Sequence, residues 1–294
     1  MNVRPDQKAI LAAFFCNFFW GLSFLASRIA LNEASVPVLL SHRFLVAFLV
    51  MSIYVLSGHA DFHLKGKSFV PLLLLGLMQP VVYFIGEQYG ILHSTTIFSG
   101  VMISIIPIAG ILAAIPVLRE FPTMRQMAFI LLSVGGVIGI GLMSNNSGSL
   151  DWIGVAALLI AVSAAVTYTL LNRNISGAYS AFERTYVMMA VGAAVFTIMA
   201  AFDVKGAPSV YLGPLFSTNY IIALLYLGVV CSVICFFLSC YSLTKLSVAR
   251  ATVFANLTTT VSVLAGAMVL HEPLTASGIV CCVLILVGIY GVQK

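Results

Sequence analysis

Long apolar stretches follow one another along almost the whole chain, and only short polar or Gly/Pro-rich segments separate them. A helix that crosses the hydrocarbon core of a bilayer needs about 20 apolar residues. We place ten transmembrane helices at residues 9–31, 37–57, 68–93, 95–118, 125–143, 152–173, 182–202, 219–244, 249–270 and 275–292. Residues 203–218, the longest connection, are predicted to form a loop. The pattern predicts an all-α polytopic membrane protein.

Composition supports a bilayer location, because 61% of the residues are hydrophobic and only 8% are charged, which is far from the usual composition of soluble domains. The apolar run of residues 9–31 is longer than the hydrophobic region of a signal peptide. We therefore expect it to remain as an uncleaved first helix. All six cysteines fall inside predicted spans and none forms a CxxC motif, so we expect no disulfide framework, no bound metal and no cofactor.

Residue types recur along the chain at a constant separation of 152 positions. At this separation Gly76, Phe84, Tyr89, Glu120, Thr123, Gly136 and Gly139 recur as Gly228, Phe236, Tyr241, Glu272, Thr275, Gly288 and Gly291. We assign two repeat units, residues 1–146 and 147–294, with five predicted helices each. An odd number of spans makes the second unit enter the membrane from the opposite side. The fold is therefore predicted to be two inverted five-helix repeats, an arrangement of many secondary transporters that work by alternating access.

Lys and Arg residues predict the orientation, because positively charged flanks stay in the cytoplasm. With ten spans, 11 of the 14 Lys and Arg residues lie on one side of the membrane and 3 on the other. Both termini are predicted to be cytoplasmic, in a multi-pass protein of the inner (plasma) membrane that is a monomer or a homodimer. This basic rim accounts for the net charge of +5 without a nucleic-acid partner.

The ends of both repeat units resemble one family. Residues 107–141 read PIAGILAAIPVLREFPTMRQMAFILLSVGGVIGIG, and residues 259–291 read TTVSVLAGAMVLHEPLTASGIVCCVLILVGIYG. Each consists of a helix, a Glu with a nearby Thr, and a Gly-rich last helix. The first unit also carries Trp20-Gly21 and His42-Arg43-Phe44. These features resemble the EamA-type transporters of the drug/metabolite transporter superfamily.

The resemblance implies a central cavity and the export of amino acids or other small metabolites. One alternative is a nucleotide-sugar or phosphate-ester exchanger, which would need several cationic groups in the cavity, whereas only Arg28 and Arg43 are available, near one end. Another alternative is a membrane-embedded enzyme. The sequence contains no HExxH, GxSxG or DxxD motif, so we predict a transporter and not an enzyme.

Glu87 is the first candidate site residue, because an ionisable group inside a span is costly and is usually functional. Gln79, Tyr83 and Glu87 are spaced by four and are predicted to share one helical face. At a separation of 152 their counterparts are Cys231, Cys235 and Ser239. Glu87 either binds a substrate amine and exchanges a proton, or neutralises a neighbouring Arg and fixes helix packing.

The remaining candidates each have two interpretations. Arg28 and Arg43 either hold a substrate carboxylate, or extend to the membrane interface or pair with Glu33 or Glu87. Trp20 and Tyr168 line either the cavity or a lipid interface. Asn256 lines the cavity or forms a hydrogen bond between helices. Glu120 and Glu272 end their spans on opposite sides of the membrane and are expected to be caps or ion pairs at the rim of a gate.

Overall fold

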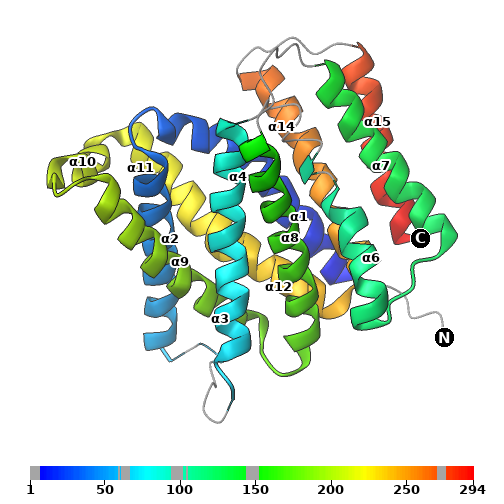
Figure 1. Ribbon diagram of the computed structural model, residues 1–294, viewed down its shortest axis with the longest axis horizontal. Helices are drawn as coiled ribbons and strands as arrows, with labels where there is room; N and C mark the ends of the chain where they lie inside the picture. The colour runs from blue at the N-terminus through cyan, green and yellow to red at the C-terminus, as the bar shows by residue number, and fades with distance from the viewer. Residues whose placement is uncertain are drawn as a thin grey trace.

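The computed structural model describes residues 7–58, 60, 67–93, 102–103, 105–143, 152–269 and 276–294. All the regular elements in this part of the chain are helical (Figure 1), which confirms the all-α class. By length and composition, eight helical segments among these residues are suited to cross a membrane, and Ile106–Leu118 and Met124–Ile140 are shorter apolar helices. The polytopic architecture is confirmed, and the count of ten stays a prediction.

The helices follow the predicted spans closely. Those of the first unit are α1 (Gln7–Leu31), α2 (Val36–Leu56), α3 (Val70–Gly76), η1 (Leu77–Val82), α4 (Tyr83–Leu92), α6 (Ile106–Leu118) and α7 (Met124–Met143). Those of the second unit are α8 (Trp152–Asn174), η2 (Ile175–Gly177), α9 (Ala181–Asp203), α10 (Pro208–Leu212), η3 (Gly213–Phe216), α11 (Thr218–Leu225), η4 (Tyr226–Ile234), α12 (Cys235–Lys245), α13 (Val248–Thr252), α14 (Ala255–Val269) and α15 (Ala276–Gln293).

The expected loop at residues 203–218 is more regular than predicted. It contains α10 and the 3-10 turn η3, each with a proline in its first turn, Pro208 and Pro214. Proline suits the first turn of a helix because the N–H that it lacks would have no partner there. These two prolines were the sequence feature that could have predicted the short helices.

The third and eighth spans are each interrupted near the middle by a π-helical segment. In the third span η1 contains Gln79, whose backbone (φ −137°, ψ 112°) is not helical, followed by Pro80. In the eighth span η4 occupies the corresponding place. Proline removes a backbone donor from a helix, and π-helical segments are frequent at functional sites. The two interrupted spans are therefore the natural place to look for a binding site.

The helices α7 and α15 pack side by side (Figure 1) through contacts that come in exchanged pairs. A Cβ added at Gly136 would lie 2.8 Å from the Cys281 carbonyl oxygen, and one at Gly288 would lie 2.6 Å from the Phe129 carbonyl oxygen. Both pairs of equivalent positions, 136 with 288 and 129 with 281, are 152 residues apart. Such reciprocal contacts are those that a two-fold axis between α7 and α15 would produce.

The helices α2 and α9 show the same exchange with a different separation. The Ser41 hydroxyl lies 3.0 Å from the Thr197 hydroxyl, and the Ser52 hydroxyl lies 3.2 Å from the Tyr186 hydroxyl. At a separation of 145 residues, position 41 corresponds to 186 and position 52 to 197. Each contact therefore joins the equivalents of the residues in the other contact. The second helix of each unit thus matches the other at a separation of 145 residues, a register that the 152-residue repeat did not reveal.

The contacts between the units relate residues matched at 152 positions to residues matched at 145 positions. A Cβ added at Gly76 would lie 2.9 Å from the Val191 Cβ, and one at Gly228 would lie 2.8 Å from a methyl carbon of Val46. Gly76 and Gly228 match at 152 positions, whereas Val46 and Val191 match at 145. The third span of each unit therefore packs on the second span of the other, around a core that includes the fully buried Phe44.

Candidate functional site

Two buried groups of opposite charge come from neighbouring spans. Arg43 in α2 is 5% exposed and Glu87 in α4 is 9% exposed. The two charges are close enough to interact electrostatically. Among the described residues, however, no nitrogen of Arg43 lies within 4.0 Å of a Glu87 carboxylate oxygen. The structure thus holds a cation and an anion near each other inside the protein without a direct ion pair between them.

Three side chains fix the position of the Arg43 guanidinium. Its Nε donates a hydrogen bond to the Ser232 hydroxyl at 2.8 Å. Its central carbon lies 5.2 Å from the centre of the Phe84 ring and 5.6 Å from that of Phe44, which gives cation–π contacts. Among the described residues its two terminal nitrogens have no hydrogen-bond partner. These nitrogens are the donors that bind a carboxylate in a bidentate manner.

Ser232 is able to hold Arg43 because of the π-helical segment η4. Its hydroxyl donates to the Leu227 carbonyl oxygen, five residues earlier, at 2.9 Å and accepts from Arg43. A π-helical turn leaves backbone carbonyls without their usual α-helical partner. Ser232 donates to the Leu227 carbonyl of this segment and at the same time positions the guanidinium.

Glu87 is held by its neighbour one turn earlier in α4. The Tyr83 hydroxyl donates to Glu87 Oε1 at 2.9 Å. Gln79 is buried, but its non-helical backbone interrupts the predicted common face, so only Tyr83 and Glu87 share a continuous helix. Gly86 faces α8 instead, since a Cβ there would lie 2.8 Å from the Ala157 carbonyl oxygen. The glycine lets α4 approach α8 and leaves the acid on another side of the helix.

Trp20 packs against the eighth span. Its indole Nε1 donates to the Cys231 carbonyl oxygen at 3.0 Å, and its ring lies edge-on to the Phe236 ring with centroids 5.3 Å apart. The polar end of Trp20 is thereby satisfied by the protein backbone. This placement favours the protein interior over the lipid interface for this residue.

Tyr168 and Asn256 lie in other helix contacts. The Tyr168 hydroxyl is 3.3 Å from the Ser239 hydroxyl, between α8 and α12. Asn256 Nδ2 donates to the Ser133 hydroxyl at 3.0 Å, and Ser133 donates to the Ile285 carbonyl oxygen at 3.4 Å. In the described part of the chain no hydrogen bond joins Asn256 to Arg43 or Glu87. Its contacts match the alternative in which it bonds across helices.

The charged pair breaks the symmetry of the two units. In the 145-residue register Arg43 corresponds to Met188, which is fully buried in α9, and in the 152-residue register Glu87 corresponds to Ser239. The second unit therefore has a thioether and a hydroxyl where the first has a guanidinium and a carboxylate. An acid inside an apolar span identified Glu87 in the sequence, but Ser232 and Phe84 were missed as partners of Arg43.

Glu120 follows the C-terminal end of α6 and contacts Arg173. Arg173 Nε lies 2.9 Å from Glu120 Oε1. The predicted rim acid of the first unit is thus placed in an ion pair with the end of α8. The Arg28 side chain and Glu272 lie outside the described residues.

Comparisons with known proteins agree on the kind of molecule. The model of the EamA-like transporter family matches residues 7–142 and 152–293. The "Uncharacterized transporter YcxC" of Bacillus subtilis (strain 168) is 31% identical over 296 residues, 99% of this chain and 94% of that protein. An "Uncharacterized transporter" of Archaeoglobus fulgidus is 26% identical over 276 residues, 94% of this chain and 95% of that protein.

One solved crystal structure has the same fold. It superposes with a TM-score of 0.78 at 17% sequence identity and covers 97% of this chain and 96% of its own. At this level of identity the likeness concerns the fold alone. It shows that nearly the whole chain adopts a fold that has been observed before.

Proposed function

The chain belongs to the EamA-like transporter family and is a membrane transporter, and on this premise we propose that it is a secondary active transporter that exports amino acids or related small metabolites by alternating access. The exchanged contacts between α7 and α15 and between α2 and α9 support two symmetry-related halves, residues 1–146 and 147–294. Halves related in this way can expose one central site to either side in turn. We place the protein in the inner membrane with both termini in the cytoplasm.

The observation that carries the substrate proposal is the separated pair of buried charges. A free amino acid has a carboxylate and an ammonium group on one carbon, so it matches a cation and an anion that are near each other but unpaired. The terminal nitrogens of Arg43 bind the carboxylate, and the Glu87 carboxylate binds the ammonium group. Each buried charge then gains a partner only when substrate is present, which favours zwitterions over singly charged solutes.

Glu87 also supplies a means of coupling to protons. In its ionised form the carboxylate attracts the substrate ammonium group, and in its protonated form this attraction is lost. Proton binding and substrate binding at Glu87 are then mutually exclusive, so that proton uptake from the outside accompanies substrate release there, which is the requirement for antiport. Tyr83 donates to Oε1 and holds the carboxylate in place during this exchange.

A nucleotide-sugar or phosphate-ester exchanger is less compatible with this geometry. Arg43 is the cation of the site, and the Glu87 carboxylate close to it would repel a phosphate group. A membrane-embedded enzyme would need catalytic groups in contact with one another. The charged groups described here contact Ser232 and Tyr83 and not each other.

The experiment measures uptake of radiolabelled amino acids and two analogues into inverted membrane vesicles. The analogues are the decarboxylated amine and the N-acetylated amino acid, each of which lacks one charge. A hydrogen bond to a charged group contributes about 1.5–3 kcal/mol, so Arg43→Gln and Glu87→Gln are each expected to reduce amino-acid uptake roughly tenfold to a hundredfold. Arg43→Lys is expected to recover part of the loss.

The two analogues show which residue binds the carboxylate of the substrate and which binds its ammonium group. Arg43→Gln should leave uptake of the amine unchanged, and Glu87→Gln should leave uptake of the N-acetylated compound unchanged and abolish the dependence of amino-acid uptake on external pH. Arg125→Gln is the control, because Arg125 lies over the Phe129 ring, far along the chain from this site. Equal losses for all three compounds in both variants would contradict the proposed arrangement.

A further inference from the structure

Polar contacts connect the ends of many helices at one end of the bundle, which we call the basic end because Arg173, Arg184 and Lys245 lie there. The chain of contacts begins at the start of α3 and finishes at the start of α13. In order it runs through Lys67, Glu183, Ser180, Arg184, Thr244, Arg173, Glu120 and Val248. Segments from both repeat units are therefore tied together at this end.

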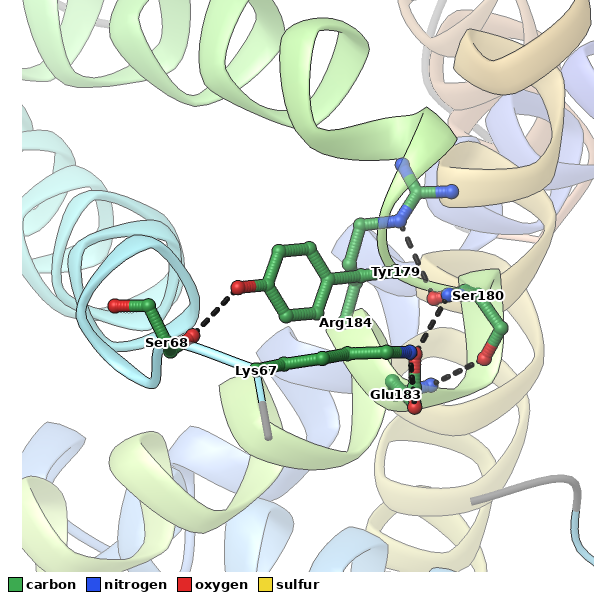
Figure 2. Close-up of polar contacts among 6 residues, drawn as sticks. All are labelled: Lys67, Ser68, Tyr179, Ser180, Glu183 and Arg184. Atoms are coloured by element: carbon green, nitrogen blue, oxygen red, sulfur yellow. Dashed lines mark hydrogen bonds and ion pairs between the residues drawn. The ribbon is translucent and has the colours of Figure 1, made fainter. Parts of the chain in front are cut away.

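The first half of this network joins Lys67, whose side chain is 33% exposed, to the buried Glu183. Figure 2 shows Lys67 reaching Glu183, with Nζ 3.0 Å from both carboxylate oxygens, and Glu183 accepting from the Ser180 backbone N–H at 2.8 Å. The Ser180 hydroxyl in turn accepts from the Glu183 N–H at 3.1 Å, which completes a capping box at the start of α9. The Tyr179 hydroxyl donates to the Ser68 carbonyl oxygen (Figure 2). The starts of α3 and α9 are thus joined.

Arg184 continues the network in the interior, and its side chain is fully buried. Among the described residues it contacts no carboxylate. Its nitrogens donate to the Asn172 carbonyl oxygen and side-chain oxygen, to the Cys240 carbonyl oxygen at 3.1 Å and to the Thr244 hydroxyl at 2.6 Å. Asn172 lies in the last turn of α8, where carbonyls lack helical partners and the helix dipole favours a cation, and Cys240 and Thr244 lie in the C-terminal half of α12.

The second half of the network is partly exposed. Arg173 Nη1 donates to the carbonyl oxygens of Leu243 and Thr244 at 3.2 and 2.8 Å, while its Nε binds Glu120. Glu120 Oε2 accepts from the Val248 N–H at 2.7 Å. The side chains of Arg173 and Glu120 are 27% and 22% exposed. We call Glu120, Arg173 and these three backbone groups the latch.

The latch joins the two units at a small cleft. Glu120 follows α6 of the first unit, whereas Arg173 ends α8 and Val248 begins α13 of the second unit. The cleft is lined by Ile111, Ala114, Glu120, Phe121, Pro122, Gln126, Ser247, Val248 and Ala249. Separation of α6 from α13 would open this cleft toward the interior of the bundle.

We propose that the latch is the gate at the basic end of the transporter, and that the buried contacts of Arg184 stay closed during transport. An ion pair in contact with water exchanges its partners for water at little cost in free energy. A buried guanidinium that loses its acceptors faces a large cost, because no water replaces them. Of the latch and the contacts of Arg184, the latch is therefore the part that opens. The proposal rests on the alternating-access mechanism proposed above.

The test uses the thiol reactivity of a cysteine placed behind the latch. Ala114 lines the cleft and is 1% exposed, so Ala114→Cys reports whether α6 and α13 are apart. All six native cysteines are buried, and labelling of the parent chain without Ala114→Cys is subtracted. The full chain is labelled with a membrane-impermeant maleimide in detergent micelles, so that the result does not depend on the topology in the membrane.

Opening of the latch is expected in both Arg173→Gln and Glu120→Gln. Loss of the ion pair and its backbone contacts should raise the labelling rate of Cys at position 114 about fivefold or more. Arg125→Gln is the matched control, because it removes the same charge from an exposed arginine at the same end of the bundle that lies over the Phe129 ring. Its labelling rate should equal that of the parent with Ala114→Cys.

Two outcomes would overturn the proposal. One is an unchanged labelling rate in Arg173→Gln and Glu120→Gln, and the other is an equal rise in Arg125→Gln. Substrate uptake is measured separately on the same variants. Faster labelling in a protein that transports none of the tested solutes would support the latch and contradict the proposed function, whereas normal labelling with altered uptake would contradict the latch alone.

Discussion

Gly136 offers the sharpest test of the packing between the two units, because Gly135 beside it is a matched control. Both residues lie within α7. A Cβ at Gly136 would lie 2.8 Å from the Cys281 carbonyl oxygen and 2.8 Å from a side-chain carbon of Ile285, whereas a Cβ at Gly135 would have no atom within 4 Å. Both Gly→Ala changes gain helix propensity, and only Gly136→Ala creates a clash with the backbone of α15.

The magnitude follows from comparing the two variants. Replacing glycine by alanine in a helix stabilises it by up to ~1 kcal/mol, and this gain is common to both. Forcing an extra carbon into a packed interface costs about 1–3 kcal/mol, and this cost applies to Gly136→Ala alone. The difference in free energy of unfolding between the variants is therefore expected to be about 1–3 kcal/mol, with Gly135→Ala the more stable.

The assay is thermal unfolding of the purified variants in one detergent at one protein concentration. Gly288→Ala should resemble Gly136→Ala, because a Cβ there would lie 2.6 Å from the Phe129 carbonyl oxygen. If Gly135→Ala and Gly136→Ala shifted the unfolding midpoint equally and in the same direction, the close approach of α7 and α15 would be refuted.

Two further predictions concern single contacts. Ser180→Ala should lower the free energy of unfolding by about 1 kcal/mol, because the Ser180 hydroxyl caps α9. The control is Ser247→Ala, since Ser247 precedes α13 without a side-chain cap, and equal midpoints in thermal unfolding would contradict this reasoning. Trp20→Phe should change the KM of uptake less than about fivefold and Trp20→Ala more than about tenfold, because the indole N–H is already bonded to the Cys231 carbonyl oxygen and only the ring remains to contact substrate. A larger loss in Trp20→Phe than in Trp20→Ala would show that the indole N–H has a different role.

Hydropathy alone located most of the helices. The predicted span 182–202 corresponds to α9 at Ala181–Asp203, and 275–292 corresponds to α15 at Ala276–Gln293. These boundaries follow from the sequence because a span must be about 20 apolar residues long and ends where polar residues or turns begin. The short helices α10 and η3 were missed, because they depend on proline in a first turn and not on hydrophobicity.

The candidate site was only partly predictable. Glu87 stood out because an acid inside an apolar span is rare, and this signal needs no structure. Ser232 gave no such signal, since a serine in a membrane helix is common and its role depends on the π-helical turn of η4. Asn256 is equally suited by sequence to a cavity and to a helix contact, and its hydrogen bond to Ser133 depends on the packing of helices that lie far apart in the chain.

By itself the sequence determined the all-α membrane class and the order of the helices, because the bilayer imposes the length of an apolar span, and it predicted the duplication, because a repeat preserves residue types. The tertiary structure alone decided which helices contact one another, and with them the 145-residue register of α2 and α9 and the partners of Arg43, Glu87 and Arg173. Contacts between residues far apart along the chain depend on the rotation and spacing of whole helices. No local pattern of hydrophobic and polar residues specifies these two quantities.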